Sequence, residues 1–375
     1  NHGVLAVNRS DGFSISNPID GTGGIRQEGS GTLAMVASNS SYSGRVSVSA
    51  GQTLEVRAST LSVTGSLISG LGSAEGFTSL EAGGTLALGD GVSSTAVNLA
   101  EIIFLKGATL RDNTIGGAES QLSGVVGLLG LNNTFQVSAL GDTMRLRGVI
   151  FGSADTSVLA GKQPANVVVT GSGNVSFDNA SNTYFGTTTI SSGAGVQLGT
   201  NSAGSIGRGD IASNGRLITN VNDGHFVLTN TITGTGSFEQ NRNTVYLTGD
   251  NTYSGGTTVT PRAGENVNVE LRVGMDTYTG SVGTGPITLS AGTFNGNAGD
   301  ANLRFHLNRD YTLASTINLN PNTDAQAVPD PKNVTLFRQG LGAMTLTGTV
   351  NVGSTTAGPA TQRATIQTEG GAQLN

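Results

Sequence analysis

The sequence predicts an all-β chain that folds as a solenoid of stacked coils. Glycine makes up 58 of the 375 residues, about twice its usual ~7%, while 36% of the residues are hydrophobic. Short apolar segments alternate with polar residues in period two, which is typical of strands with one buried face. Similar segments recur along the chain, and units that cannot bury an apolar face alone do so by stacking.

Composition excludes several classes of partner. Charged residues make up 12% of the chain, the net charge is -6, and there is no cysteine. Nucleic-acid binding requires a basic stripe, which is missing, and binding to an anionic membrane surface is disfavoured for the same reason. The most apolar run, Val125–Leu131, is far too short to span a bilayer. We therefore predict no nucleic-acid partner and no direct membrane insertion.

A repeat becomes visible when the chain is aligned on tyrosine. Each copy has a Gly-x-Gly opening, an apolar strand, a polar corner with asparagine, a tyrosine, a glycine and a Thr/Val strand. Three copies span Gly234–Val259, Gly171–Ile190 and Gly21–Val48, and a partial copy spans Phe337–Val352. A coil of roughly 20 to 25 residues would account for this spacing.

A shorter unit of one turn and one strand also recurs. It is found at Ala50–Val56, Ala82–Leu88, Lys106–Leu110, Gly193–Leu198 and Gly370–Leu374. Alternation within these copies predicts strands with one face in the core and the other in solvent.

The most complete repeat allows residue-level expectations. Gly255 and Gly256 are expected to supply positive φ at a corner. Asn251 is expected to bond neighbouring backbone and to stack as a ladder from coil to coil. Thr257–Val259 is expected to resume a strand. Tyr253 is expected to cover the edge of the core with its hydroxyl in water.

The chain is predicted to be one β-helical segment over residues 1–375. Residues 60–165 are less repetitive but still alternate turns and strands, and Ala100–Leu110 reads as strand rather than helix. Asn320–Asn333 contains three of the eight prolines and is predicted to be a loop projecting from the coils. A start at Asn1 rather than methionine is expected for an excised segment.

The segment Gly234–Phe294 resembles the passenger-associated repeat of bacterial type V secreted autotransporters. The likeness is looser over Gly171–Leu217 and Gly21–Val56, and the rest of the chain matches in style only. The resemblance implies a right-handed parallel β-helix that is displayed on the bacterial cell surface or secreted. Chains of this kind are similar to adhesins, self-associating aggregation factors and some surface enzymes.

Catalytic motifs are weak in this sequence. A serine hydrolase needs serine, histidine and an acid in contact, and only His2, His225 and His306 are available. His306 is expected to face solvent with Arg304, because the apolar residues around it alternate onto the other face. His225 follows Asp223, but no G-x-S-x-G elbow adjoins it.

No pattern for a cofactor or metal is present. The acidic residues are dispersed, without the paired carboxylates of glycan-cleaving enzymes. Calcium-binding nonapeptides and EF-hand loops are absent, and the Gly-x-Gly openings lack the Lys-Ser/Thr of a phosphate loop. We predict no catalytic residue, cofactor or metal ligand.

One tripeptide is a candidate binding motif. Arg208, Gly209 and Asp210 resemble the integrin-recognition sequence. The simpler interpretation is a turn of the repeat, because the parallel copy has Thr284–Pro286 at this place.

The sequence favours a non-enzymatic surface adhesin or a self-association factor in aggregation and biofilm formation. Its partner would be a host-cell receptor, a matrix protein or glycan, or another copy of the chain. A passive stalk that presents another domain remains as the alternative, and a surface hydrolase comes third. The predicted loop at Asn320–Asn333 favours binding, because function tends to lie on loops over a rigid scaffold.

Overall fold

The computed structural model describes most of the chain in two compact units. The described residues are 2–37, 41–57, 71–73, 75–152, 164–262, 267–277, 279–291, 299–321, 333–353, 363–369 and 372–374. Unit 1 comprises Asn1–Gln197 with Gly204–Gly209, and unit 2 comprises Leu198–Ala203 with Asp210–Asn375. The prediction of one β-helical segment over the whole chain stays a prediction.

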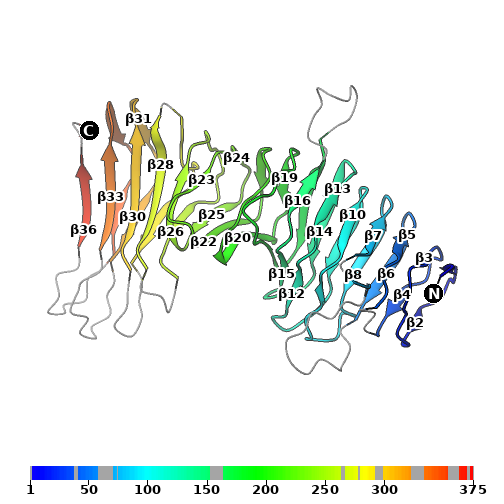
Figure 1. Cartoon of the computed structure of the whole chain (residues 1–375). Coiled ribbons are helices and arrows are strands. Elements are labelled where there is room, and N and C mark those ends of the chain that lie inside the picture. Colours follow the sequence, from blue (N-terminus) through cyan, green and yellow to red (C-terminus); the bar gives the residue numbers. More distant parts are fainter. Residues whose placement is uncertain are drawn as a thin grey trace. The chain divides into compact units, whose positions relative to one another are not determined.

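Unit 1 consists of three parallel sheets, and no helix occurs among its described residues (Figure 1). The first sheet contains β1 (Val4–Val7), β3 (Gly24–Gln27), β5 (Arg45–Val48), β7 (Phe77–Leu80), β10 (Ile102–Leu105), β13 (Val126–Leu128) and β16 (Ile150–Gly152). The second contains β2 (Phe13–Ile15), β4 (Leu33–Met35), β6 (Thr53–Val56), β8 (Thr85–Leu88), β11 (Thr109–Asp112), β14 (Asn132–Val137), β17 (Asn166–Gly171) and β19 (Thr188–Ile190). The third contains β9 (Asn98–Leu99), β12 (Glu119–Leu122), β15 (Thr143–Leu146) and β18 (Asn174–Phe177).

Unit 2 is built in the same way from parallel strands. One sheet contains β22 (Arg216–Val221), β25 (Ser237–Gln240), β27 (Thr257–Val259), β29 (Ile287–Ser290), β32 (Ile317–Asn320) and β35 (Val350–Val352). A second contains β23 (Phe226–Leu228), β26 (Asn243–Leu247), β28 (Val269–Thr277), β30 (Ala301–Leu307), β33 (Val334–Gln339) and β36 (Ala364–Thr368). Shorter pairings join β31 (Tyr311–Leu313), β34 (Ala343–Leu346) and β37 (Gln373–Leu374), and β21 (Ile211–Ser213) with β24 (Ile232–Thr233). The strand β20 (Gly195–Ser202) spans the division between the units.

The stacked parallel strands form a parallel β-helix in each unit, as the sequence predicts. From β7 to β18 the chain visits the three sheets of unit 1 in strict rotation, so each coil adds one strand to each sheet. The segment Ala100–Leu110 forms β10 and the start of β11, which confirms the strand interpretation. No helix in the described part of the chain is long and apolar enough to cross a membrane.

Coil length varies more than the predicted 20 to 25 residues. Val4 pairs in register with Gly24, 20 positions later, but Val46 pairs with Thr78, 32 positions later. In unit 2, Leu303 pairs with Leu336, 33 positions later. Corners can lengthen without shifting the strands, because each doubling of a loop costs only about 0.6 kcal/mol in closure entropy.

The repeat tyrosines lie inside the core, which corrects the expectation of a hydroxyl in water. Tyr184 and Tyr253 are at most 1% exposed, and each hydroxyl hydrogen-bonds the threonine hydroxyl four residues later at 2.7 Å. Tyr42 is also fully buried and donates to the carbonyl of Gly23 at 2.7 Å. Burial raises the pKa of all three tyrosines to about 12.

The other expectations for the repeat are met in part. Thr257–Val259 is β27, and Gly256 has the predicted positive φ of 103°. Gly255 does not have positive φ. Glycine is needed there because an added Cβ would lie 2.6 Å from the carbonyl of Gly236 in the preceding coil. Asn251 bonds neighbouring backbone as expected: its Oδ1 accepts from Ile232 N–H at 2.8 Å, and its Nδ2 donates to the carbonyl of Ser281 at 2.7 Å. Stacking of asparagines from coil to coil stays a prediction.

The predicted projecting loop cannot be compared with the structure over most of its length. Asn320 ends β32, and Asn333 precedes β33. Residues 322–332 lie outside the described residues.

Candidate functional surface

The candidate tripeptide lies in a turn between strands. Arg208 is exposed, and its guanidinium lies 5.0 Å from the ring centre of Phe185. Asp210 is also exposed. Arg208 and Gly209 belong to unit 1, whereas Asp210 begins the longer segment of unit 2.

Stacking accounts for the glycine of this tripeptide. A Cβ on Gly209 would lie 2.3 Å from the carbonyl oxygen of Gly186 in the preceding coil. Gly285, at the same place in the parallel copy, would meet the carbonyl oxygen of Ser254 at 2.3 Å. Both turns therefore exclude side chains for the same steric reason, which supports the interpretation of this stretch as a turn of the repeat. The integrin-like interpretation stays a prediction.

The histidines are not joined to a nucleophile among the described residues. His306 faces outward with Arg304 as predicted, but its side chain is only 16% exposed and its Nε2 lies 2.6 Å from Asp276 Oδ1. The link between His225 and Asp223 is a backbone contact, because the N–H of His225 donates to Asp223 Oδ1 at 3.2 Å. The imidazole of His225 instead stacks on Tyr246, with ring centres 6.0 Å apart.

The fold brings together one pair of acids that the sequence separates by 30 positions. Asp112 and Asp142 are buried in unit 1, and Thr114 Oγ1 lies 2.7 Å from Asp112 Oδ1 and 3.4 Å from Asp142 Oδ2. Burial raises the pKa of Asp112, and the charge of Asp142 adds a smaller increase. The hydrogen bonds from Thr114 lower this pKa but do not offset the effect of burial. The pair lies in the core without access to a substrate. No group of three or more metal-binding side chains occurs in the described part of the chain.

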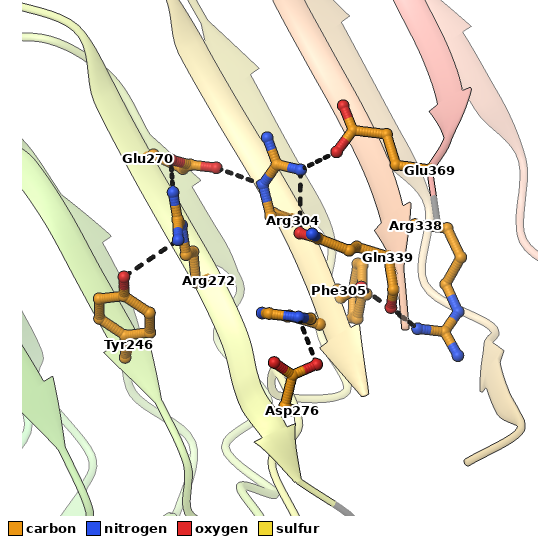
Figure 2. A network of polar contacts seen from close by, with 10 residues as sticks. Tyr246, Glu270, Arg272, Asp276, Arg304, Phe305, Arg338, Gln339 and Glu369 are labelled. Atoms are coloured by element: carbon orange, nitrogen blue, oxygen red, sulfur yellow. Dashed lines mark hydrogen bonds and ion pairs between the residues drawn. The ribbon is translucent and has the colours of Figure 1, made fainter. Parts of the chain in front are cut away.

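A network of polar contacts lies on the outer face of β28, β30 and their neighbours (Figure 2). Glu270 accepts hydrogen bonds from Arg272 Nη2 at 2.9 Å and from Arg304 Nε at 2.6 Å. Arg304 continues the network with Nη1 at 2.6 Å from Glu369 Oε2, and its guanidinium lies 4.2 Å from the ring centre of Phe337. Three coils are thereby joined by charged side chains.

Most polar groups of this network have internal partners. Burial alone would raise the pKa of Glu270, but the hydrogen bonds from Arg272 and Arg304 outweigh it and hold the pKa below its usual value. Arg272 also donates to the hydroxyl of Tyr246 at 3.0 Å. Because these opposite charges lie in contact and partly neutralise one another, the network stabilises unit 2. Alternation along β28 places Glu270 and Arg272 on one face, but no pattern in the sequence indicates Arg304, which lies 34 positions after Glu270.

Arg338 is a buried cation that serves the same structural purpose. It is 1% exposed and points inward from β33, beside Phe305 of the preceding coil. Its guanidinium donates to backbone carbonyls at the corners of two coils, including Leu307 at 2.9 Å and Leu341 at 2.8 Å.

A second outer face of unit 2 is polar and nearly uncharged. Thr258, Thr288, Asn318 and Asn351 lie in register on β27, β29, β32 and β35. Asn351 Nδ2 donates to Asn318 Oδ1 at 3.0 Å, and Asn318 Nδ2 donates to Thr288 Oγ1 at 3.4 Å. We call these four residues the Thr/Asn ladder. Glu239 of β25 precedes them in the same row and brings one charge.

The Thr/Asn ladder presents fixed hydrogen-bonding groups to solvent. Successive side chains are one coil apart, about 4.8 Å. Each amide uses one donor within the ladder and keeps another hydrogen and a lone pair available. Flanking it, Asn320 Nδ2 donates to Ser290 Oγ at 3.3 Å. Such a surface suits binding through many weak hydrogen bonds.

Comparison with known proteins identifies the repeats. The family described as passenger-associated-transport-repeat matches residues 25–56, 167–194 and 243–261. Each matched stretch contains one of the buried tyrosines, Tyr42, Tyr184 or Tyr253. No curated protein and no solved structure matches the chain.

Proposed function

From the premise that these repeats make the chain a segment of an autotransporter passenger domain, we propose that it is a non-enzymatic surface adhesion module. Passenger domains of this family are secreted or lie on the cell surface. The proposed partner is a second copy of the chain, held through the Thr/Asn ladder of unit 2.

The main support for this proposal is that hydrogen bonds hold the asparagine side chains of the Thr/Asn ladder in fixed positions before any partner binds. Its asparagine side chains are held by their neighbours along the row. Binding therefore loses less side-chain entropy than it would with free side chains. The low charge of the row also matters, because Glu239 is the single charge beside the four residues of the Thr/Asn ladder, so two identical rows repel each other little.

The test is bead clumping. Beads coated with the chain should clump at physiological salt, whereas albumin-coated beads should not. Replacing Thr288→Asp together with Asn318→Asp should disperse them, because two copies would then face each other with paired like charges. The matched control, Thr134→Asp with Gln136→Asp, places two charges on the outward side of β14 in unit 1 and should leave clumping unchanged.

Other outcomes select the alternatives. Absence of clumping by the unmodified chain rejects self-association. Binding of the same beads to host cells or matrix proteins would then favour a host receptor. Binding to neither would favour a passive stalk. The third alternative, a surface hydrolase, has no support in the surroundings of the described histidines.

A further inference from the structure

A groove on the outer face of unit 1 has the composition of a ligand site. It has a volume of about 350 Å³, at the lower end of the ~300–1,000 Å³ typical of small-molecule sites. It crosses β1, β3 and β5 on the first sheet. Its lining residues are Val4, Gly24, Arg26, Arg45, Ser47, Val48, Ser49 and Glu81.

Gly24 creates the hollow. It lies in register with Val4 on β1, and β5 places Arg45 on its other side. Outward side chains fill this row on both sides, but Gly24 contributes none. A Cβ added here would meet Val4 Cγ2 at 3.4 Å and the Arg45 carbonyl oxygen at 3.8 Å. The backbone therefore tolerates a side chain at this position, and the groove exists because the sequence places glycine there.

Arg45 is held in place beside the hollow. Its guanidinium lies 5.5 Å from the ring centre of Phe77, which packs edge-to-face on Phe104 with ring centres 5.8 Å apart. Phe104 packs in turn on Phe151 at 6.5 Å, over Gly127, where a Cβ would lie 2.6 Å from the Phe104 ring. This aromatic row restricts the motion of Arg45, so little side-chain entropy is lost when an anion binds.

The charges around the groove leave one cation without a carboxylate. Arg26 pairs with Glu28 at 3.2 Å, and Lys106 pairs with Glu81 at 2.6 Å. Arg45 forms no ion pair with any residue that the structure describes. A ligand that places one carboxylate in the groove therefore fits better than a phosphate chain, whose further charges would meet Glu81.

The remaining lining groups suit hydroxyls. Ser47 and Ser49 can donate and accept hydrogen bonds, and the Glu81 carboxylate accepts from pairs of hydroxyls. Val4 and the open floor at Gly24 can receive the apolar side of a ring. We propose that this groove binds an acidic saccharide, with the sugar carboxylate on the Arg45 guanidinium and the sugar hydroxyls on Ser47, Ser49 and Glu81.

The experiment is a calorimetric titration of the whole chain at low salt. The probe is an octasaccharide of alternating glucuronic acid and N-acetylglucosamine, and the neutral comparison is an N-acetylglucosamine octasaccharide. The acidic probe should bind at least tenfold more tightly than the neutral one. Its affinity should fall with added salt, because the contact at Arg45 is exposed and screened. Equal affinity for the two saccharides would overturn the proposal, as would no binding of the acidic probe.

Two variants locate the site. Arg45→Gln should weaken binding of the acidic probe about tenfold or more, because it removes a charge-assisted contact. Gly24→Val should abolish binding by filling the hollow, and valine is favoured in a strand. Arg9→Gln is the control, since Arg9 also lies over a phenyl ring of unit 1, at 5.3 Å from that of Phe13, but outside the groove. Circular dichroism of Arg45→Gln, whose side chain is exposed, should show an unchanged fold.

The peptide hexaglutamate separates saccharide recognition from simple attraction to carboxylates. Binding of hexaglutamate as tight as that of the acidic octasaccharide would refute a saccharide site, as would normal binding by both Arg45→Gln and Gly24→Val. The proposal does not depend on self-association through unit 2. Arg45→Gln should therefore leave bead clumping unchanged.

Discussion

At the scale of single residues, the repeats are held by a buried tyrosine and a threonine four positions later. Tyr253 and Thr257 illustrate the arrangement, with 2.7 Å between their oxygen atoms and almost no exposure to solvent. A hydrogen bond in this place replaces water at both oxygens. Losing the Tyr253 hydroxyl would deprive the buried Thr257 oxygen of this partner, and leaving a buried polar group unpaired costs more than the bond itself contributes.

We therefore expect Tyr253→Phe to lower the free energy of unfolding by about 1–2 kcal/mol. Thr257→Val should have a smaller effect, because the Tyr253 oxygen keeps its hydrogen bond with the backbone of Gly283. The double variant should cost less than the sum, with a coupling of about 0.5–1.5 kcal/mol measured by urea denaturation. Strict additivity would show that the two hydroxyls do not interact.

The glycines that face these tyrosines should be equally sensitive. A Cβ on Gly283 would lie 2.1 Å from the Tyr253 carbonyl oxygen and 2.5 Å from its ring. Gly283→Ala should lower the melting temperature and cost at least about 2 kcal/mol. Gly224→Ala is the control in the same unit, since nothing lies within 4 Å of its Cβ position and its φ is not positive. Similar melting temperatures for the two variants would contradict the steric argument.

Sequence patterns predict where these residues lie better than what they contact. Alternation places Thr257 in a strand, but the pattern contains no information on which side chain reaches its hydroxyl. Tyr253 was therefore expected at the edge of the core. Asn251 was expected to bond neighbouring backbone, and its amide joins the backbones of the coils before and after it. Such partners belong to other coils, 19 and 30 positions away.

At the scale of strands, charged side chains join separate coils of unit 2. Glu270 on β28 links its neighbour Arg272 to Arg304 on β30, and Arg304 reaches Glu369 just beyond β36 (Figure 2). The Glu270 side chain is only 16% exposed, so solvent screens these contacts less than it screens surface pairs.

This network predicts a specific loss of stability in acid. The pKa of Glu270 lies below its usual value of 4.5 in the folded chain. Its contribution is therefore fully present above pH 4.5 and is lost as the pH falls through the lower folded pKa. Glu270→Gln should cost about 1–3 kcal/mol at pH 7, and the gap from the unmodified chain should narrow below pH 4.5.

Urea denaturation at a series of pH values measures this gap. Glu239→Gln is the control, because Glu239 points outward from β25 and forms no ion pair within the described part of the chain. It should change stability little at any pH. A gap for Glu270→Gln that stays constant down to pH 3 would exclude the proposed linkage.

Strands were the most predictable elements, and loops the least. Three of the short turn-and-strand units, β6, β8 and β11, stack in register with Thr53, Thr85 and Thr109 aligned. The alternating pattern alone was enough to find them. Coil length was not predictable in the same way, because residues inserted at a corner change neither the pattern nor the pairing. The outer surface was harder to predict. The groove exists because Gly24 has no side chain, and the periodic pattern does not distinguish this glycine from an ordinary turn glycine.

At the scale of the whole chain, each unit contains buried tyrosine hydroxyls of the repeat. Tyr42 and Tyr184 belong to unit 1 and Tyr253 to unit 2. Burial raises the pKa of each to about 12, compared with 10.0 for a free tyrosine. The folded chain therefore holds these protons more tightly than the unfolded chain does. Stability from this source is fully present below pH 10 and is lost as the pH rises towards 12.

We accordingly expect alkaline unfolding that involves both units. Tyrosinate absorbance from the three buried residues should rise together with the loss of the strand signal in circular dichroism. For Tyr184 and Tyr253 the linkage amounts to about 2–3 kcal/mol each once the pH exceeds 12. Replacing either one by phenylalanine should reduce by one the number of protons released on alkaline unfolding, so the transition should be less steep in pH. This effect is separate from the loss of stability at neutral pH. Full ionisation of all tyrosines below pH 11 with the strand signal intact would show that the hydroxyls are open to water, and that the repeats are not closed around them.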